Sequence, residues 1–246
     1  MKPFLVLQLR PEAEAADDEY AAMLQKGALE QDDTHRIRLD FDPLPDTLDL
    51  DDFSGVIVGG GPGCVSDPLS EKDPVERRIE EAVFSLMPEV TSRDIPFMGC
   101  CYGIGILAHH LGASVNKENY SEPVGATTCE MTDAGRADPL MSGLPETFRA
   151  FVGHKEAVQE LPQGCAHLAS SDPCPFQVIR YGENVYATQF HPELDSYWIE
   201  RRVHIYKNHG YFPPEKAEEL IELGHRENVT VPEALLRRFV NRYARD

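Results

Sequence analysis

The 246-residue sequence has no long apolar run. Its first apolar stretch, Phe4 to Leu9, spans about six residues, which is too short for the apolar region of a signal peptide or for a membrane span. No later segment approaches the roughly 18 continuous apolar residues of a transmembrane helix. We therefore expect a cytoplasmic protein that has no membrane partner.

Basic residues are also scarce. Lys and Arg number 23 against 42 Asp and Glu, for a formal net charge of −19. Many of the acids lie in loops such as the segment from Asp40 to Asp52, and they do not form a single tail. Such a surface repels phosphate backbones, so nucleic acid is not an expected partner.

Metal-binding and cofactor-binding patterns are missing as well. The six cysteines form no C-x-x-C pair and have no zinc-type spacing with histidine. The glycine-rich stretch VGGGPG (Val58 to Gly63) lacks the G-K-[ST] ending of a phosphate-binding loop. We expect neither a metal nor a cofactor, and in a reducing compartment a cysteine is by default a small buried apolar residue.

The first half of the chain alternates short apolar runs with amphipathic helical segments. Strands are predicted over Phe4 to Leu9, His35 to Leu39, Gly55 to Val58 and Ile95 to Met98, and helices over Glu12 to Lys26 and Asp73 to Met87. This alternation predicts an α/β fold with an open, mostly parallel sheet and helices on both faces. Ligands bind such sheets beyond the carboxyl ends of the strands.

The second half is organised differently. Residues 112–191 are rich in short strands and include a hairpin that turns at residues 182–184, and three helical segments follow Pro192. With 41% hydrophobic and 26% charged residues, the composition is that of an ordinary globular protein. We expect one α/β domain over residues 1–195 and a helical C-terminal extension over 196–246, packed on the domain or on a partner.

The stretch PFMGCCYGIGIL places two cysteines at the end of a predicted strand. A nucleophile at a strand-to-helix elbow needs small residues two positions before and after it, because the chain doubles back there. Centring this pattern on Cys101 places Gly99 and Gly103 at the small positions, whereas Cys100 would place Met98 and Tyr102 there. Cys101 is therefore the candidate nucleophile, at the start of a helix whose dipole favours thiolate.

The segment QFHPEL supplies a base for this thiol. Pro192 favours an extended conformation at His191, and residues two apart in an extended chain point the same way. Glu193 can therefore orient the imidazole of His191 and stabilise its protonated form. The backbone N–H groups of VGGGPG are candidate donors to an oxyanion, with a phosphate cradle as the less favoured alternative.

The motifs GGGP, GCCYG and TQFHPE, in this order, resemble those of the class I, triad-type glutamine amidotransferases, and in particular the glutaminase domain of GMP synthase and its stand-alone relatives. The resemblance covers roughly Phe4 to Asp195. It implies a flavodoxin-like fold, with Cys101 as nucleophile, His191 as general base and acid, and Glu193 as its orienting partner. It also assigns the oxyanion hole to the backbone N–H groups of Gly61 and Tyr102.

Two motifs depart from the family pattern around the substrate. The family usually has glutamine four residues after the nucleophile, where this chain has Gly105, and its S-H-G-D segment becomes Gly153-His154-Lys155-Glu156. By resemblance, the substrate-binding positions are Gly60, Gly105, Gly153, His154 and Lys155. The substrate expected is glutamine, with a γ-glutamyl peptide or amide as the alternative and a non-catalytic binding role as a second alternative.

The acceptor of the ammonia is also open. About 50 residues follow the triad, too few for a nucleotide-binding synthetase domain. The resemblance therefore implies either a separate synthetase subunit that receives the ammonia or a simple hydrolase.

Overall fold

The computed structural model describes residues 2–245, which contain a nine-stranded sheet in the order β2-β1-β3-β4-β11-β10-β9-β6-β7. Five neighbouring strands are parallel: β2 (Thr34–Arg38), β1 (Phe4–Gln8), β3 (Gly55–Val58), β4 (Phe97–Cys100) and β11 (Val185–Thr188). The other four pair antiparallel: β10 (Val178–Tyr181), β9 (Cys165–Ser171), β6 (Glu122–Met131) and β7 (Thr147–His154). The expected α/β fold with a flavodoxin-like parallel sheet is confirmed, and an antiparallel extension completes it.

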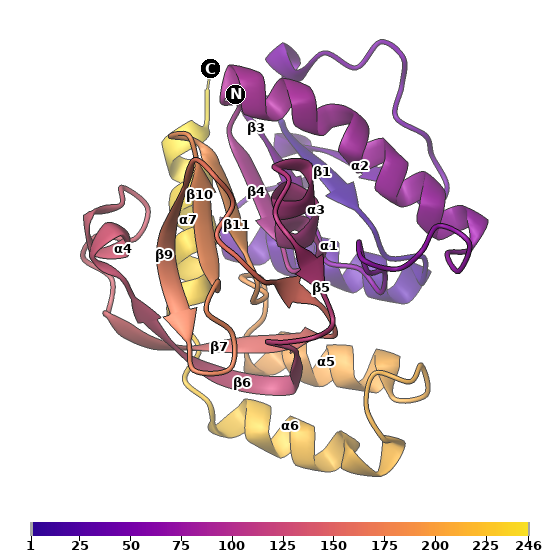
Figure 1. Ribbon diagram of the computed structural model, residues 1–246. Coiled ribbons are helices and arrows are strands. Elements are labelled where there is room, and N and C mark those ends of the chain that lie inside the picture. Colours follow the sequence, from indigo (N-terminus) through magenta and orange to yellow (C-terminus); the bar gives the residue numbers. More distant parts are fainter. Residues whose placement is uncertain (1, 246) are drawn as a thin grey trace.

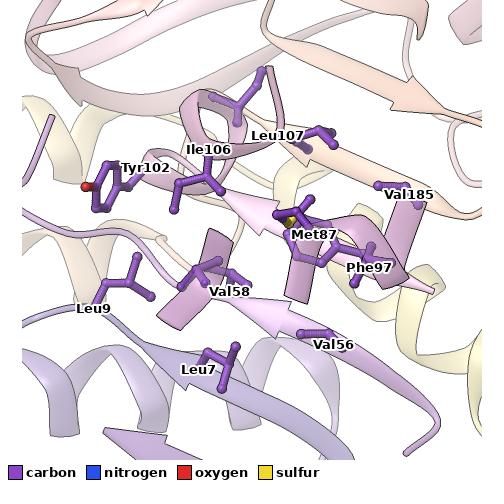
Figure 2. Packing of buried hydrophobic residues seen from close by; sticks show 14 of the residues in the cluster. Leu7, Leu9, Val56, Val58, Met87, Phe97, Tyr102, Ile106, Leu107 and Val185 are labelled. Atoms are coloured by element: carbon purple, nitrogen blue, oxygen red, sulfur yellow. The ribbon is translucent and has the colours of Figure 1, made fainter. Parts of the chain in front are cut away.

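Alternate side chains of β1 pack into two hydrophobic cores, one on each face of the sheet. Leu5 and Leu7 pack on one face of the sheet with α2 (Pro74–Arg93) and α3 (Tyr102–His110). Phe4 and Val6 pack on the other face with α1 (Ala13–Gly27) and α7 (Val231–Tyr243). Figure 2 shows the first of these cores, in which Leu7, Val56 and Val58 of the strands lie beneath Ile106 and Leu107 of α3. Every residue of β1 is buried, as expected for a parallel strand covered on both faces.

Two further helices lie under the antiparallel end of the sheet. In Figure 1, α5 (Ser196–Tyr206) and α6 (Ala217–Arg226) lie together below β6 and β7. They form a third core with Phe151 of β7 and Ala22 of α1. The chain ends lie close together, where the Lys2 N–H donates to the carbonyl of Arg245 at 2.7 Å.

Short elements complete the chain. They are α4 (Asp133–Ala137), the two-stranded pair β5 (Val115–Asn116) and β8 (Ala157–Val158), and 3₁₀ turns at Gln31–Asp33, Leu50–Asp52 and Pro214–Lys216. Among residues 2–245, no helix is both long enough and apolar enough to cross a bilayer.

Local sequence signals predict some helix boundaries and fail at others. The Asp73 carboxylate accepts from the N–H groups of Val75 and Glu76, as its position before Pro74 predicts. The same helix continues past the expected end at Met87, through Pro88, to Arg93, because Val90 is fully buried in the core and keeps the last turns packed. At α7 the stretch Thr230-Val231-Pro232-Glu233 has the sequence of a capping box, but the Thr230 side chain makes no capping bond.

Candidate active site

Cys101 occupies a strained elbow between β4 and α3. Its backbone has φ 53° and ψ −92°, a conformation that costs a residue with a side chain about 1–3 kcal/mol. The Cys101 N–H donates to the carbonyl of Thr188, at the end of β11, at 2.8 Å. This bond ties the elbow to the neighbouring parallel strand and holds the thiol at the carboxyl ends of the strands.

The two glycines of the elbow are not equivalent. A Cβ atom at Gly99 would lie 3.0 Å from the carbonyl carbon and oxygen of Gly103, so a side chain cannot fit there without moving the backbone. A Cβ atom at Gly103 would meet only Val58, at 3.8 Å, which is an ordinary contact. Steric exclusion therefore applies at Gly99, and Gly103 has room for a methyl group.

Two other thiols, Cys100 and Cys64, lie next to Cys101 in the chain or in the cavity wall, and both have raised pKa values. Cys100 is fully buried in the core, and burial raises its pKa well above the usual range. Cys64 lies in the wall of the same cavity as Cys101, but burial and the nearby Glu156 raise its pKa to about 12. Both stay protonated near neutral pH, which leaves them poor nucleophiles.

His191 and Glu193 form a buried hydrogen-bonded pair. The distance from Nδ1 of His191 to Oε1 of Glu193 is 2.8 Å, and both side chains are at most 9% exposed. The His191 N–H donates to the carbonyl of Phe151 at 3.1 Å, which fixes the backbone that carries the ring. The segment is a turn, not the extended chain expected from Pro192, since the Leu194 N–H donates to the His191 carbonyl at 3.3 Å.

The surroundings of this pair favour its charged form. Burial lowers the pKa of His191, but the Glu193 carboxylate and the neighbouring Cys101 sulfur outweigh it and raise that pKa to about 9. Burial raises the pKa of Glu193, but the charges of His191 and Arg202 outweigh this effect and hold the carboxyl pKa well below its usual range. An imidazolium at neutral pH is thus the state the site stabilises.

Two buried arginines stand behind the pair. The Nε of Arg10, two residues after the end of β1, lies 2.7 Å from Oε1 of Glu19 on α1. Arg202 of α5 has its guanidinium nitrogens 3.5 Å from Asp18 and 3.8 Å from Glu193. Acidic groups thus face both arginines in the interior, but Nε and Nη2 of Arg202 have no hydrogen-bond partner among the described residues.

The glycine loop is held against this charged cluster. The Gly60 N–H donates to Oε1 of Glu19 at 3.1 Å, and a Cβ atom at Gly60 would lie 2.6 Å from the His191 ring. Gly60 thus lies against the imidazole, where a larger residue would displace it. The next residue, Gly61, borders the same cavities as Cys101.

A cavity of about 380 Å³ opens in front of Cys101, and we call it the larger cavity. Its size falls in the range of small-molecule sites, about 300–1,000 Å³. Of the positions assigned from the sequence, it is lined by Cys101, Gly61, Tyr102, Gly105, Gly153, His154 and Lys155. Gly60 stands outside its lining, against the His191 ring.

Glu156 takes up space beside Gly105. A Cβ atom at Gly105 would lie 3.2 Å from Oε1 of Glu156. The Glu156 carboxylate accepts from the N–H groups of Val65 and Ser66, at 2.7 and 2.9 Å, and from the Ser66 hydroxyl at 2.7 Å. The two departures from the family pattern, at Gly105 and at Glu156, therefore lie against each other, and together they form one wall of the larger cavity.

A buried polar group continues this wall around His154. Nε2 of His154 lies 3.0 Å from Oε2 of Glu122, which also accepts from Nε2 of Gln177 at 2.6 Å. Cys174 is close enough to complete a metal-ligand trio with Glu122 and His154. Oε2 of Glu122 is already hydrogen-bonded to both His154 and Gln177, so the group fits a structural polar cluster.

A second cavity, of about 50 Å³, also borders Cys101, and we call it the smaller cavity. It shares Cys101, Gly61, Val124, Gly153 and Tyr211 with the larger cavity. His191 lines the smaller cavity and does not line the larger one. The rest of its wall consists of Arg10, Val152, Leu194, Ile199, Arg202, Val203, Tyr206 and Phe212.

Sequence reasoning missed the contribution of the C-terminal segment and of the buried arginines. Arg202 and Tyr211 lie beyond the last motif, on a stretch whose polar pattern resembles an exposed helix and loop. Arg10 had a usable signal, since it lies two residues after the end of β1, at the same edge of the sheet as the elbow. Nothing local marks Glu19, because only the folded chain brings it against Gly60.

The chain thus has an open α/β sheet that carries a cysteine elbow and a buried His–Glu pair at its carboxyl edge. The model of the family "Glutamine amidotransferase class-I" matches residues 30–209 of this chain. This match spans more than half of the chain, and the protein belongs to that family.

Curated relatives are similar over part of the chain. A GMP synthase [glutamine-hydrolyzing] from Thermosipho melanesiensis is 36% identical over 143 residues, which cover 57% of this chain and 24% of that protein. The same enzyme from Streptococcus pyogenes is 29% identical over the same coverage. The matched segment thus spans about a quarter of the length of these relatives.

Solved structures share the whole fold. A glutamine amidotransferase from Thermotoga maritima superimposes with a TM-score of 0.77 at 22% identity, over 99% of this chain and 98% of that one. A glutamine amido transferase from Methylobacillus flagellatus has a TM-score of 0.73 at 19% identity, over 100% and 97% of the two chains. At such identities the similarity shows the fold alone.

Proposed function

We propose that this protein hydrolyses the side-chain amide of glutamine to glutamate and ammonia through a thioester on Cys101. The observation that carries the proposal is the placement of Cys101 at a strained elbow that borders the same cavity as His191, itself bonded to Glu193. Membership of the class I glutamine amidotransferase family supports it.

The first half of the reaction uses the protonated imidazole. The Cys101 sulfur attacks the side-chain carbonyl carbon of glutamine and forms a tetrahedral oxyanion. As the carbon–nitrogen bond breaks, His191 gives its proton to the nitrogen, and ammonia leaves with the thioester remaining on Cys101. The raised pKa of His191, about 9, supports this role because the ring carries the proton at neutral pH.

The oxyanion needs donors that are in place before the attack. Tyr102 is the first residue of α3, so its N–H has no partner within the helix and lies at the positive end of the helix dipole. Gly61 is the second candidate, since it borders both cavities beside Cys101. Each such donor lowers the barrier by about 3 kcal/mol.

The second half returns the enzyme to its first state. Neutral His191 takes a proton from water, the resulting hydroxide attacks the thioester carbon, and glutamate leaves as the Cys101 sulfur recovers its negative charge. Glu193 stabilises the imidazolium that forms in this step.

A γ-glutamyl peptide or amide is the second candidate substrate. It is supported by the wall at Gly105 and Glu156, where the family's usual glutamine side chain is missing. The same attack on Cys101 would release an amine in place of ammonia. A separate synthetase that receives ammonia is a compatible partner, since the curated relatives are glutamine-hydrolysing GMP synthases.

Paired cysteine variants test the proposal. With glutamine as substrate, we expect Cys101→Ala to abolish glutamate release and Cys100→Ala to retain most of it. Mass spectrometry of the native protein after brief incubation with glutamine should find the glutamyl adduct on the peptide that contains Cys101. Glutamate release that survives in Cys101→Ala would refute the assignment.

A further inference from the structure

Glu19 of α1 is a buried carboxylate that the proposed reaction does not use. Its side chain is fully buried, and it offers a carboxylate oxygen within 4.8 Å of a ring nitrogen of His191 and of a carboxylate oxygen of Glu193. Burial of a charged group costs several kcal/mol unless its partners compensate the charge. A second carboxylate beside the His191–Glu193 pair therefore needs strong partners of its own.

The partners of Glu19 are a guanidinium and the glycine loop (Val58 to Gly63). Oε1 accepts from Nε of Arg10 at 2.7 Å and from the Gly60 N–H at 3.1 Å. Oε2 is buried without a hydrogen-bond partner among residues 2–245, and a Cβ atom at Gly59 would overlap it. The carboxylate thus lies directly against the backbone of the loop.

Space, and not an unusual backbone conformation, requires glycine in this loop. None of its three consecutive glycines has a positive φ. A Cβ atom at Gly60 would lie 2.6 Å from the His191 ring, and one at Gly61 would lie 3.2 Å from the Tyr102 ring. The loop is therefore packed tightly between Glu19 and the residues around the thiol.

Three consecutive glycines have little conformational preference of their own, so this backbone needs an external restraint. The Gly59 N–H donates to the Leu7 carbonyl at 3.0 Å. The Gly60 N–H donates to Glu19, the one side chain in the described part of the chain that binds these glycines. Gly61 borders both cavities, and its N–H has no partner among the described residues. Because a bound N–H fixes its peptide plane, Glu19 restrains the chain one residue before the candidate oxyanion donor.

Arg10 balances the charge of this carboxylate. An unpaired carboxylate close to a developing oxyanion would oppose its formation, but the guanidinium of Arg10 lies against Glu19. Burial lowers the pKa of Arg10, but Glu19 and the neighbouring tyrosines outweigh this effect and raise that pKa well above its usual range. The hydroxyl of Tyr206 accepts from Nη1 of Arg10 at 3.0 Å, which ties the ion pair to α5.

On the basis of the proposed function, we propose that Glu19 is a positioning residue of the active site. Its bond to Gly60 holds the glycine loop so that the Gly61 N–H faces the oxyanion that forms on attack by Cys101. Glu19 lines neither cavity, so it acts through the loop and does not touch the substrate. A determinant of kcat thus lies on α1, outside all three sequence motifs.

Two substitutions separate the hydrogen bond from the charge. Glu19→Gln keeps an oxygen that can accept from Gly60 and loses the charge, whereas Glu19→Asp keeps the charge and withdraws the carboxylate from the loop. Loss of one oxyanion donor lowers kcat by about 100-fold or more. We therefore expect kcat for glutamine, per titrated Cys101, to fall by about 100-fold in Glu19→Asp and by less than about 10-fold in Glu19→Gln.

Binding of the unreacted substrate distinguishes positioning from a general loss of structure. The Kd for glutamine, measured by calorimetry in a Cys101→Ala background, should change by less than about 2-fold when Glu19→Asp is added, because the oxyanion exists only after attack. Glu14→Gln is the control, since Glu14 lies on the same helix but is exposed, and it should keep the native kcat.

Three results would overturn the inference and leave the proposed function intact. They are a native kcat in Glu19→Asp, equal losses of kcat in Glu19→Asp and Glu19→Gln, and a Kd that rises as far as kcat falls. Failure of the native protein to release glutamate from glutamine would overturn both.

Discussion

Nδ1 of His191 lies 2.8 Å from Oε1 of Glu193 in the interior of the protein, with only Pro192 between the two residues. The turn that they share closes a short loop, so the carboxylate approaches the ring without help from a distant element. Arg202 of α5 lies 3.8 Å away and adds a positive charge behind the carboxylate. The arrangement keeps Glu193 ionised and the imidazole protonated.

Replacement of Glu193 by glutamine tests the role of this charge. We expect Glu193→Gln to lower kcat for glutamine by about 100-fold or more, because the neutral amide no longer stabilises the imidazolium. The pKa of His191, about 9 in the native protein, should fall when the carboxylate is removed. The alkaline limb of the rate of thioester formation should therefore move to lower pH, by about one unit or more.

Single-turnover measurements between pH 6 and 10 would follow this limb. Glu183→Gln, which changes a glutamate whose side chain is 79% exposed, should retain the native profile. An unshifted limb in Glu193→Gln would show that the carboxylate does not set the pKa of His191.

The same pKa predicts how stability depends on pH. His191 titrates near 9 in the folded protein and near 6.5 in an unfolded chain, so the folded state binds the proton more tightly. Its contribution to stability is therefore full below about pH 6.5 and is lost as the pH rises through about 9. The contribution is about 3 kcal/mol.

Urea unfolding of the native protein and of His191→Asn at pH 6 and pH 9.5 measures this contribution. The difference in free energy of unfolding between the two proteins should be about 3 kcal/mol larger at pH 6. A difference that is the same at both pH values would contradict the pKa shift.

The parallel half of the fold and the cysteine elbow could be predicted because local sequence patterns indicate both. Short apolar runs alternate with helical segments, and Gly99 and Gly103 lie two residues before and after Cys101. The smaller cavity could not be predicted in this way. Arg10 and Tyr206 form a hydrogen bond across 196 positions, and no periodicity links them.

The C-terminal end of α2 could not be predicted for a different reason. Pro88 favours a helix end, since it lacks an N–H and crowds the preceding turn. Core packing overrides this local preference, because Met87 and Val90 on either side of it are fully buried. Tertiary contacts of this kind are invisible in a single sequence.

The elbow glycines provide a matched pair of variants. A Cβ atom at Gly99 would lie 3.0 Å from the Gly103 carbonyl, whereas one at Gly103 would lie 3.8 Å from Val58. We expect Gly99→Ala to lower the free energy of unfolding by about 1–3 kcal/mol and to reduce thioester formation, because the backbone that carries Cys101 must shift. Gly103→Ala lies within α3 and should be neutral or stabilise by up to about 1 kcal/mol.

Thermal unfolding and labelling of Cys101 by a glutamine-like electrophile would measure these two effects. Equal behaviour of the two variants would contradict the steric difference between the two positions.

The glutamine that the family usually has four residues after the nucleophile can be restored at position 105. We expect Gly105→Gln to raise KM for glutamine with little change in kcat, because its Cβ would lie 3.2 Å from the Glu156 carboxylate and would crowd the larger cavity. The double variant Gly105→Gln with Glu156→Asp shortens the crowding side chain and should recover part of the loss. Steady-state kinetics on the three proteins would decide, and an unchanged KM in the single variant would contradict contact between this wall and the substrate.

The last helix is expected to matter for stability without entering the chemistry. Phe239 of α7 is fully buried, with its ring 6.2 Å from that of Phe4 on β1 and 4.9 Å from that of Tyr243. Phe239→Ala should lower the free energy of unfolding by about 3–5 kcal/mol, because it leaves a cavity between the helix and the sheet. Leu69→Ala, at a side chain that is 62% exposed, should change it by less than about 0.5 kcal/mol. Since Phe239 borders neither cavity, kcat per titrated Cys101 should equal the native value in both variants, and a fall confined to Phe239→Ala would show that α7 also supports the active site.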